Sequence, residues 1–120
     1  MQTVIDRINE LVQTTNATDF NVSSFNHDNL ILTASFDHCY YHEFEVHFYG
    51  VAYMELPVDC IRNPRFSIAN NSVSRLYSHL SLDIDELLFG VYQDFNLDNR
   101  HRFYVATQQI ELIEGMVYYY

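Results

Sequence analysis

Three side chains that could bind a metal ion fall at alternate positions in one stretch of the chain. They are Glu43, Glu45 and His47, and alternate residues of a β-strand point to the same face. Carboxylates and imidazoles are both metal ligands, but residues four apart on a strand are separated by about 13 Å. One ion would therefore need ligands from neighbouring strands. The metal hypothesis that follows uses three histidines converging in a pocket: His38, His47 and His101.

Other kinds of catalytic chemistry find little support. The chain contains no lysine, so it supplies neither a Schiff-base amine nor the lysine of a phosphate-binding loop. Cys39 follows His38, but adjacent residues on a strand point to opposite faces and do not form a catalytic pair. Cys39 and Cys60 are expected to be plain thiols, with one disulfide between them as the alternative. The sequence therefore favours a protein without enzymatic activity, and we expect no cofactor.

The charge balance argues against nucleic acid and in favour of a basic partner. The chain has sixteen acidic residues and six arginines, which gives a formal charge of −10. Such a chain repels phosphate backbones, whereas it attracts a basic protein over long distances. The same charge could also serve solubility alone. We expect no binding to nucleic acid.

Four arginines are grouped in two short segments. Arg62 and Arg65 lie in one, and Arg100 and Arg102 lie in the other. Together they could form a small anion-binding pocket in an otherwise acidic protein. The alternative is that each arginine pairs with surface acids, and exposed pairs of that kind contribute less than about 1 kcal/mol each.

One long alternating stretch, from Phe44 to Leu56, would position the main candidates for partner binding. Its even positions are apolar or glycine, whereas its odd positions mix acids, histidine and tyrosine with one valine, Val51. This period of two predicts a β-strand with one face on a core. Tyrosine buries apolar area while keeping a polar tip, and it is common at protein interfaces. The residues that we expect to contact a protein partner are those of the odd face: Glu45, His47, Tyr49, Tyr53 and Glu55.

Aromatic residues also gather at the end of this sequence. The segment Met116 to Tyr120 contains three consecutive tyrosines, and as a strand at a sheet edge it could pair with a copy of itself. These tyrosines could instead cap the sheet of a single chain. Because homo-oligomers are common, we expect either a separate protein partner or a homodimer.

Periodicity and turn residues predict the remaining elements. Apolar residues at helical spacing indicate an amphipathic helix over about 3–14. The polar stretch 14–29 is expected to be an irregular connection, with a short edge strand as the alternative. Residues 72–80 are ambiguous between helix and strand, and the pattern favours a short helix. Further strands are expected over 30–36, 66–69, 87–95, 103–107, 110–113 and 116–120, with a hairpin turn at 37–40 and a tight turn at 114–115.

These elements predict one compact domain over residues 1–120, with the β body over about 30–120. We expect a mainly β (α+β) fold. Regularly spaced strands with local turns indicate an antiparallel β-sandwich or barrel-like sheet of about 6–8 strands. The N-terminal helix, and a further short helix if 72–80 forms one, would pack on it. The alternative is a single open sheet with helices resting on one face.

The sequence also bears on location. No apolar run approaches the roughly 20 residues that cross a membrane as a helix, and the stretch Met1 to Arg7 lacks the features of a secretion signal. We therefore expect a cytoplasmic protein that makes no contact with a membrane.

Three runs of residues carry a resemblance to known proteins: His27-Asp28 before Leu30-Ile31-Leu32, Phe44-x-Val46-x-Phe48-x-Gly50-Val51-x-Tyr53 before Leu56-Pro57, and Phe103-Tyr104-Val105-Ala106 before Ile110-Glu111-Leu112. They are similar to runs in small bacterial β-rich proteins of unknown function, some of which are immunity proteins that block a toxin by binding it. The resemblance implies protein binding and carries over no site residue. Our first hypothesis is thus a non-enzymatic domain that neutralises or scaffolds a basic protein. The alternative is a small-ligand or metal-binding β-sandwich or barrel that uses histidines near the long strand.

Overall fold

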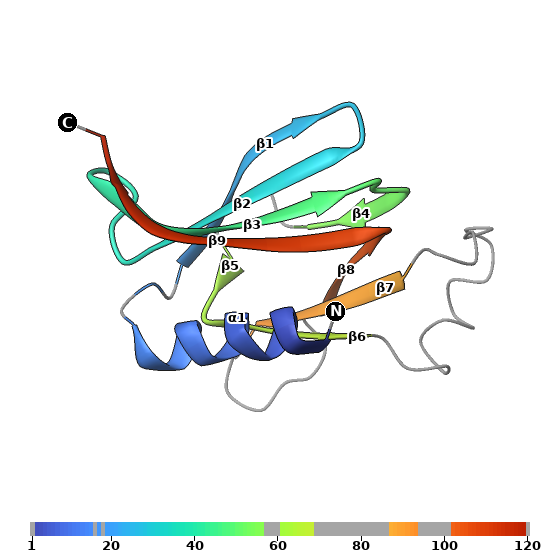
Figure 1. Ribbon diagram of the computed structural model, residues 1–120, viewed down its shortest axis with the longest axis horizontal. Helices are drawn as coiled ribbons and strands as arrows, with labels where there is room; N and C mark the ends of the chain where they lie inside the picture. The colour runs from blue at the N-terminus through green and yellow to red at the C-terminus, as the bar shows by residue number, and fades with distance from the viewer. Residues whose placement is uncertain are drawn as a thin grey trace.

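The computed structural model describes residues 2–15, 17, 19–56, 61–68, 87–93 and 102–119, with the backbone alone for 87–93 and 102. It confirms a mainly β fold with an N-terminal helix (Figure 1). The described elements are, in chain order, α1 (Gln2–Thr14), β1 (Asp19–Asn26), β2 (Asn29–Ser35), β3 (Tyr41–Tyr49), β4 (Tyr53–Glu55), β5 (Ile61–Arg62), β6 (Pro64–Ile68), β7 (Leu87–Gln93), β8 (Arg102–Thr107) and β9 (Gln109–Tyr118).

The strands form two antiparallel sheets that are joined at both sides. Sheet A has the order β5-β1-β2-β3-β9, and sheet B has the order β4-β8-β7-β6. On one side, the neighbours β3 and β9 continue into the neighbours β4 and β8 of the other sheet. On the other side, β5 leads directly into β6. The two sheets therefore follow one path around a common interior, which gives the barrel-like arrangement that the sequence predicts.

Gly50 is the point at which the alternating stretch from Phe44 to Leu56 changes sheets. Its φ angle of +67° is one that glycine adopts readily because it has no Cβ. Gln108, between β8 and β9, donates its backbone N–H to the carbonyl of Tyr49 at 3.1 Å. This hydrogen bond joins the bend between β3 and β4 to the bend between β8 and β9. The prediction of one long strand is therefore wrong, because β3 and β4 belong to different sheets.

The core contains the even positions of β3, as the alternation predicts. Phe44, Val46 and Phe48 are all buried. The ring of Phe20 on β1 packs against Phe44 and against Phe66 of β6, with ring centroids 5.5 and 5.6 Å apart. Because Phe20 lies on sheet A and Phe66 on sheet B, this aromatic group holds the sheets together. The predicted helix adds an apolar face made of Ile5, Ile8, Leu11 and Val12.

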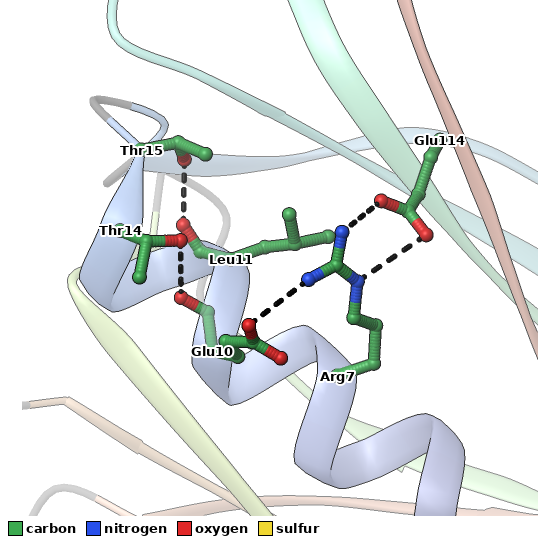
Figure 2. A network of polar contacts seen from close by, with 6 residues as sticks. All are labelled: Arg7, Glu10, Leu11, Thr14, Thr15 and Glu114. Carbon is green, nitrogen blue, oxygen red and sulfur yellow. Dashed lines mark hydrogen bonds and ion pairs between the residues drawn. The ribbon is translucent and has the colours of Figure 1, made fainter.

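Polar side chains tie α1 to an edge strand of each sheet. The Asn9 amide donates to the carbonyl of Phe66 at 2.9 Å, and its oxygen accepts the N–H of Phe66 at 2.8 Å. Figure 2 shows Arg7 reaching from α1 to β9, where it binds both carboxylate oxygens of Glu114 at 2.7 and 3.3 Å. Arg7 also lies 3.2 Å from an oxygen of Glu10. The orientation of the helix is thus set by polar contacts as well as by burial.

Strand β1 corrects the prediction of an irregular connection over 14–29. It pairs with β2 along its length, but the register shifts between Val22 and Ser24. This bulge interrupts the alternation of apolar and polar residues, and an alternating pattern is the signal from which a strand is predicted. The β body accordingly begins at Asp19 and not near residue 30.

Strand β9 corrects the predicted tight turn at Glu114-Gly115. The two strands expected there are one continuous strand that pairs with β3. Gly115 has a φ angle of +139° and lies where the β3–β9 register shifts. Glycine therefore marks a bulge here, one of the other uses of this residue within a strand. The helix favoured over 72–80 lies outside the described residues.

Candidate functional site

The outer face of sheet A carries the odd positions of β3. Glu45, His47 and Tyr49 are partly exposed, and they alternate with buried residues that point into the core. The register places Glu111 of β9 beside His47. The first three predicted contact residues therefore share a face, as the alternation indicates.

A line of hydrogen bonds runs through this face and ends at a tyrosine on either side. The Glu45 carboxylate uses both oxygens, with Oε2 lying 2.8 Å from His42 Nε2 and Oε1 lying 2.7 Å from His47 Nε2. Nδ1 of His42 lies 2.9 Å from the hydroxyl of Tyr119, and Nδ1 of His47 lies 3.3 Å from that of Tyr49. These five residues are called the Glu45 chain below.

The Glu45 carboxylate is the acceptor at the centre of the Glu45 chain, because it has no proton to donate. The Nε2–H of each histidine therefore donates to Glu45, and each Nδ1 lies beside a tyrosine hydroxyl. The side chains are shielded from water, with exposed fractions of 8% for His42, 13% for His47 and 24% for Glu45. The Glu45 chain is therefore a polar clasp that holds Tyr119, just beyond the end of β9, against the start of β3.

The clasp lowers the pKa of Glu45. Burial by itself raises the pKa of this carboxyl, but the hydrogen bonds from His47 and His42, with the charges of these two side chains, outweigh it, so the pKa lies below its ordinary value of 4.5. A carboxyl with a lowered pKa in the folded state stabilises the fold above its unfolded pKa. That contribution is lost as the pH falls through the folded pKa.

We expect Glu45→Gln to weaken the acid sensitivity of the fold. The wild-type free energy of unfolding should decrease as the pH falls from about 5 to about 3, and the decrease should be smaller in the variant. Denaturant unfolding at a series of pH values measures both. Glu55→Gln removes one acid from β4 and controls for the change in net charge. Equal pH dependence in Glu45→Gln and wild type would contradict the clasp.

Sequence alternation does not find His42 as a partner of Glu45. It places His42 on the buried face with Phe44, and His42 is indeed buried. The register of β3 and β9 shifts between His42 and Phe44, and a bulge increases the local twist of the strands. At this twisted part of β3, the side chains of His42 and Glu45 lie within hydrogen-bond distance of each other. The residue in the sequence that indicates this bulge is Gly115. Because glycine is also common in turns, the sequence predicts a turn there instead.

The other two predicted contact residues lie in the other sheet, beyond the Gly50 corner. On β4, the hydroxyl of Tyr53 donates to Glu55 at 2.8 Å, and this hydrogen bond, followed by burial, raises the pKa of Tyr53. On β3, burial raises the pKa of Tyr49, and the charge and hydrogen bond of Glu111 raise it further. Two tyrosine–glutamate pairs thus lie on either side of the corner.

Two of the three histidines of the metal hypothesis, His38 and His47, are described, and they lie at different positions along sheet A. Nε2 of His38 lies 2.9 Å from the carbonyl oxygen of Asp19, and His47 belongs to the Glu45 chain. The register of β1, β2 and β3 separates these two places by four residues of strand, or about 13 Å. Among the described residues, no three His, Cys, Asp or Glu side chains are placed to hold a metal ion. His101 lies outside the described residues, so this hypothesis stays a prediction.

The anion-binding hypothesis also stays a prediction. Arg62 on β5 and Arg65 on β6 are exposed and lie on consecutive strands that belong to different sheets. The side chains of Arg100 and Arg102 lie outside the described part of the chain. Cys39 is an exposed free thiol. Cys60 lies outside the described residues.

In the part of the chain that the structure describes, the helix is neither long nor apolar enough to cross a membrane. The chain matches no family model, no curated protein and no solved structure. Its function is therefore inferred from its own side chains: the Glu45 chain, the two tyrosine–glutamate pairs and the exposed residues of β9.

Proposed function

We propose that this chain is a non-enzymatic protein-interaction domain that binds a basic protein through its two tyrosine–glutamate pairs. The supporting observation is their placement, with Tyr49 and Glu111 on sheet A and Tyr53 and Glu55 on sheet B. The chain connects the two pairs by only a few residues around Gly50. A partner that contacts both would span the corner between the sheets.

An aromatic ring beside a carboxylate suits the side chain of arginine or lysine. The carboxylate provides a charge-assisted hydrogen bond, and the face of the tyrosine ring attracts a cation. Glu55 and Glu111 are exposed, and Tyr49 and Tyr53 are partly exposed, so a partner can reach all four. Tyrosine also gives a large contact area at a low cost in conformational entropy.

Glu45 and His47 have a different role in this proposal. Both oxygens of Glu45 and both ring nitrogens of His47 already have hydrogen-bond partners within the chain. They therefore hold the outer face in place and do not supply the charge that the partner binds. The formal charge of −10 adds long-range attraction, which salt screens.

The resemblance to small bacterial immunity proteins suggests what binding a basic protein would achieve. A basic protein met in the cytoplasm would be neutralised or scaffolded by this acidic domain. No chemical step is required of the domain, because occupying the surface of the partner is sufficient.

We expect Tyr49→Ala combined with Tyr53→Ala to weaken the binding of a basic probe. The probe is hexa-arginine, titrated into isotope-labelled protein and followed by NMR. The dissociation constant should rise by about tenfold or more, since both cation–aromatic contacts are lost. Wild-type amides that shift on binding should cluster around the two tyrosine–glutamate pairs.

The matched control is Tyr40→Ala combined with Tyr118→Ala, which removes two exposed tyrosines elsewhere. Both double variants keep the net charge, so nonspecific attraction of the probe is the same in each. Equal affinity of hexa-arginine for the two double variants would show that the proposed surface is wrong. Dispersed NMR spectra establish that each variant is folded.

A further inference from the structure

Strand β9 forms one end of sheet A and, with ten residues, is the longest of the described strands. It pairs with β3 on one side, and within the described residues no strand pairs with its other side. In Figure 1 the end of β9, in red, curves away from α1 towards the C terminus. The outer edge of such a strand offers backbone N–H and C=O groups to another chain.

The other described edges are shorter, occupied or interrupted. On β6, at the end of sheet B, Asn9 binds both backbone groups of Phe66. Strands β4 and β5 have only three and two residues. The exposed part of β1 contains a bulge between Val22 and Ser24. Strand β9 keeps a regular register with β3 from Gln109 to Glu114, and its own register shift lies beyond this stretch, at Gly115.

The side chains of β9 and of the residue after it favour contact over exposure to water. Neither lysine nor proline, which often block sheet edges, occurs in β9. Five large apolar or aromatic side chains are exposed along it, and covering them would remove apolar area from water. They are Ile113 (40%), Met116 (47%), Val117 (44%), Tyr118 (65%) and Tyr119 (46%).

The two acids of β9 have different neighbours within the chain. Glu114 receives two hydrogen bonds from Arg7 (Figure 2), and Arg7 lowers the pKa of Glu114. Glu111 is hydrogen bonded to Tyr49. Arg7 thus balances the charge of Glu114, the carboxylate next to Ile113, so the apolar positions around Ile113 suit a strand of the same composition.

We propose that the outer edge of β9 pairs antiparallel with β9 of a second copy of this chain, which joins two copies of sheet A into one continuous sheet. Antiparallel pairing about a two-fold axis lets the same edge serve both copies. With Ile113 opposite Ile113 of the second copy, Glu111 faces Gly115 and Glu114 faces Leu112. No two carboxylates then lie directly opposite each other, which would be destabilising.

Sedimentation velocity from about 5 to about 500 µM protein tests this pairing, because dimer formation depends on concentration. The wild type should shift from monomer to dimer over this range. Since each copy is strongly acidic, the dimer should be stronger in about 0.5 M than in about 0.05 M NaCl. Binding of a basic partner has the opposite salt dependence. A wild type that is monomeric at every concentration and salt overturns the proposal.

The variant Met116→Lys places a charge on the edge and should weaken the dimer by about tenfold or more. The matched control is Phe25→Lys on β1, whose side chain has the same exposed fraction of 47% and which changes the net charge equally. It should dimerise as the wild type does. Loss of the dimer in Phe25→Lys alone would place the contact on β1 and overturn the proposal.

Hydrogen exchange of the wild type gives a second test that needs no variant. Backbone amides of β9 should exchange more slowly at high than at low protein concentration, whereas those of Val22 to Asn26 on β1 should not change. Concentration-independent exchange along β9 in a sample that dimerises would also overturn the proposal.

Discussion

Phe20→Ala is expected to destabilise the fold by about 3–5 kcal/mol, a large part of the roughly 5–15 kcal/mol that holds a typical domain together. Phe20 is fully buried, and its ring lies between Phe44 of sheet A and Phe66 of sheet B. Its removal leaves a cavity where the two sheets meet, and the neighbouring rings fill it only in part. Urea unfolding followed by circular dichroism or by tyrosine fluorescence measures the loss.

The same strand offers a matched control. Phe25→Ala removes an identical side chain from β1, but that side chain is 47% exposed, so its loss should amount to less than about 1 kcal/mol. If Phe20→Ala does not fold, Phe20→Leu should still do so with a cost below about 1.5 kcal/mol. Equal losses in Phe20→Ala and Phe25→Ala would contradict the role of Phe20 as the contact between sheets.

Gly50→Val is expected to destabilise the fold by about 2–4 kcal/mol, from backbone strain and crowding together. The φ angle at this position is +67°, and an added Cβ would lie 2.6 Å from Oε1 of Gln108 and 2.8 Å from its Cδ. A β-branched residue is rarely found at such an angle. Because Gly50 is the corner between β3 and β4, the variant strains the connection between Tyr49 and Tyr53 and should also weaken hexa-arginine binding.

A double-variant comparison separates the two causes. The Gln108 side chain is flexible, so Gln108→Ala combined with Gly50→Val should recover the part of the loss that comes from crowding. About 1–2 kcal/mol of backbone strain should persist. Complete recovery in the double variant would show that the positive φ angle is not required at this corner.

The burial pattern of β3 could be predicted because it depends on neighbours along the chain. Alternate residues of a strand point to the same side, so Phe44, Val46 and Phe48 had to face a core together. The end of the strand could not be predicted in this way. The alternation continues through Gly50, and the bend there depends on Gln108, a residue distant in sequence.

The bulges in β1 and β9 each led to a wrong prediction from the sequence. In β1 the shift between Val22 and Ser24 conceals a strand, because one extra residue reverses the apolar face. In β9 the same kind of irregularity at Gly115 suggests a turn. Both errors arise because a bulge is recognised only when the partner strand is known.

Part of the candidate site could be predicted from the sequence and part of it could not. Alternation brings Glu45, His47 and Tyr49 to one face. It does not bring His42 or Tyr119 to them, since that requires the pairing of β3 with β9 and the twist at its bulge. The metal and anion hypotheses each include residues outside the described part of the chain, and they stay predictions.

By itself, the sequence determined a mainly β chain with an N-terminal helix, an acidic surface and a strand with one apolar and one polar, aromatic face. These properties follow from composition and from the two-residue period of a strand, which are local. Only the tertiary structure decided that two of the three metal-ligand residue types on this face, Glu45 and His47 but not Glu43, belong to a hydrogen-bonded clasp. It also decided that the alternating stretch bends at Gly50. Hydrogen bonds and bends depend on which strands become neighbours, and that choice is made by the packing of the whole chain.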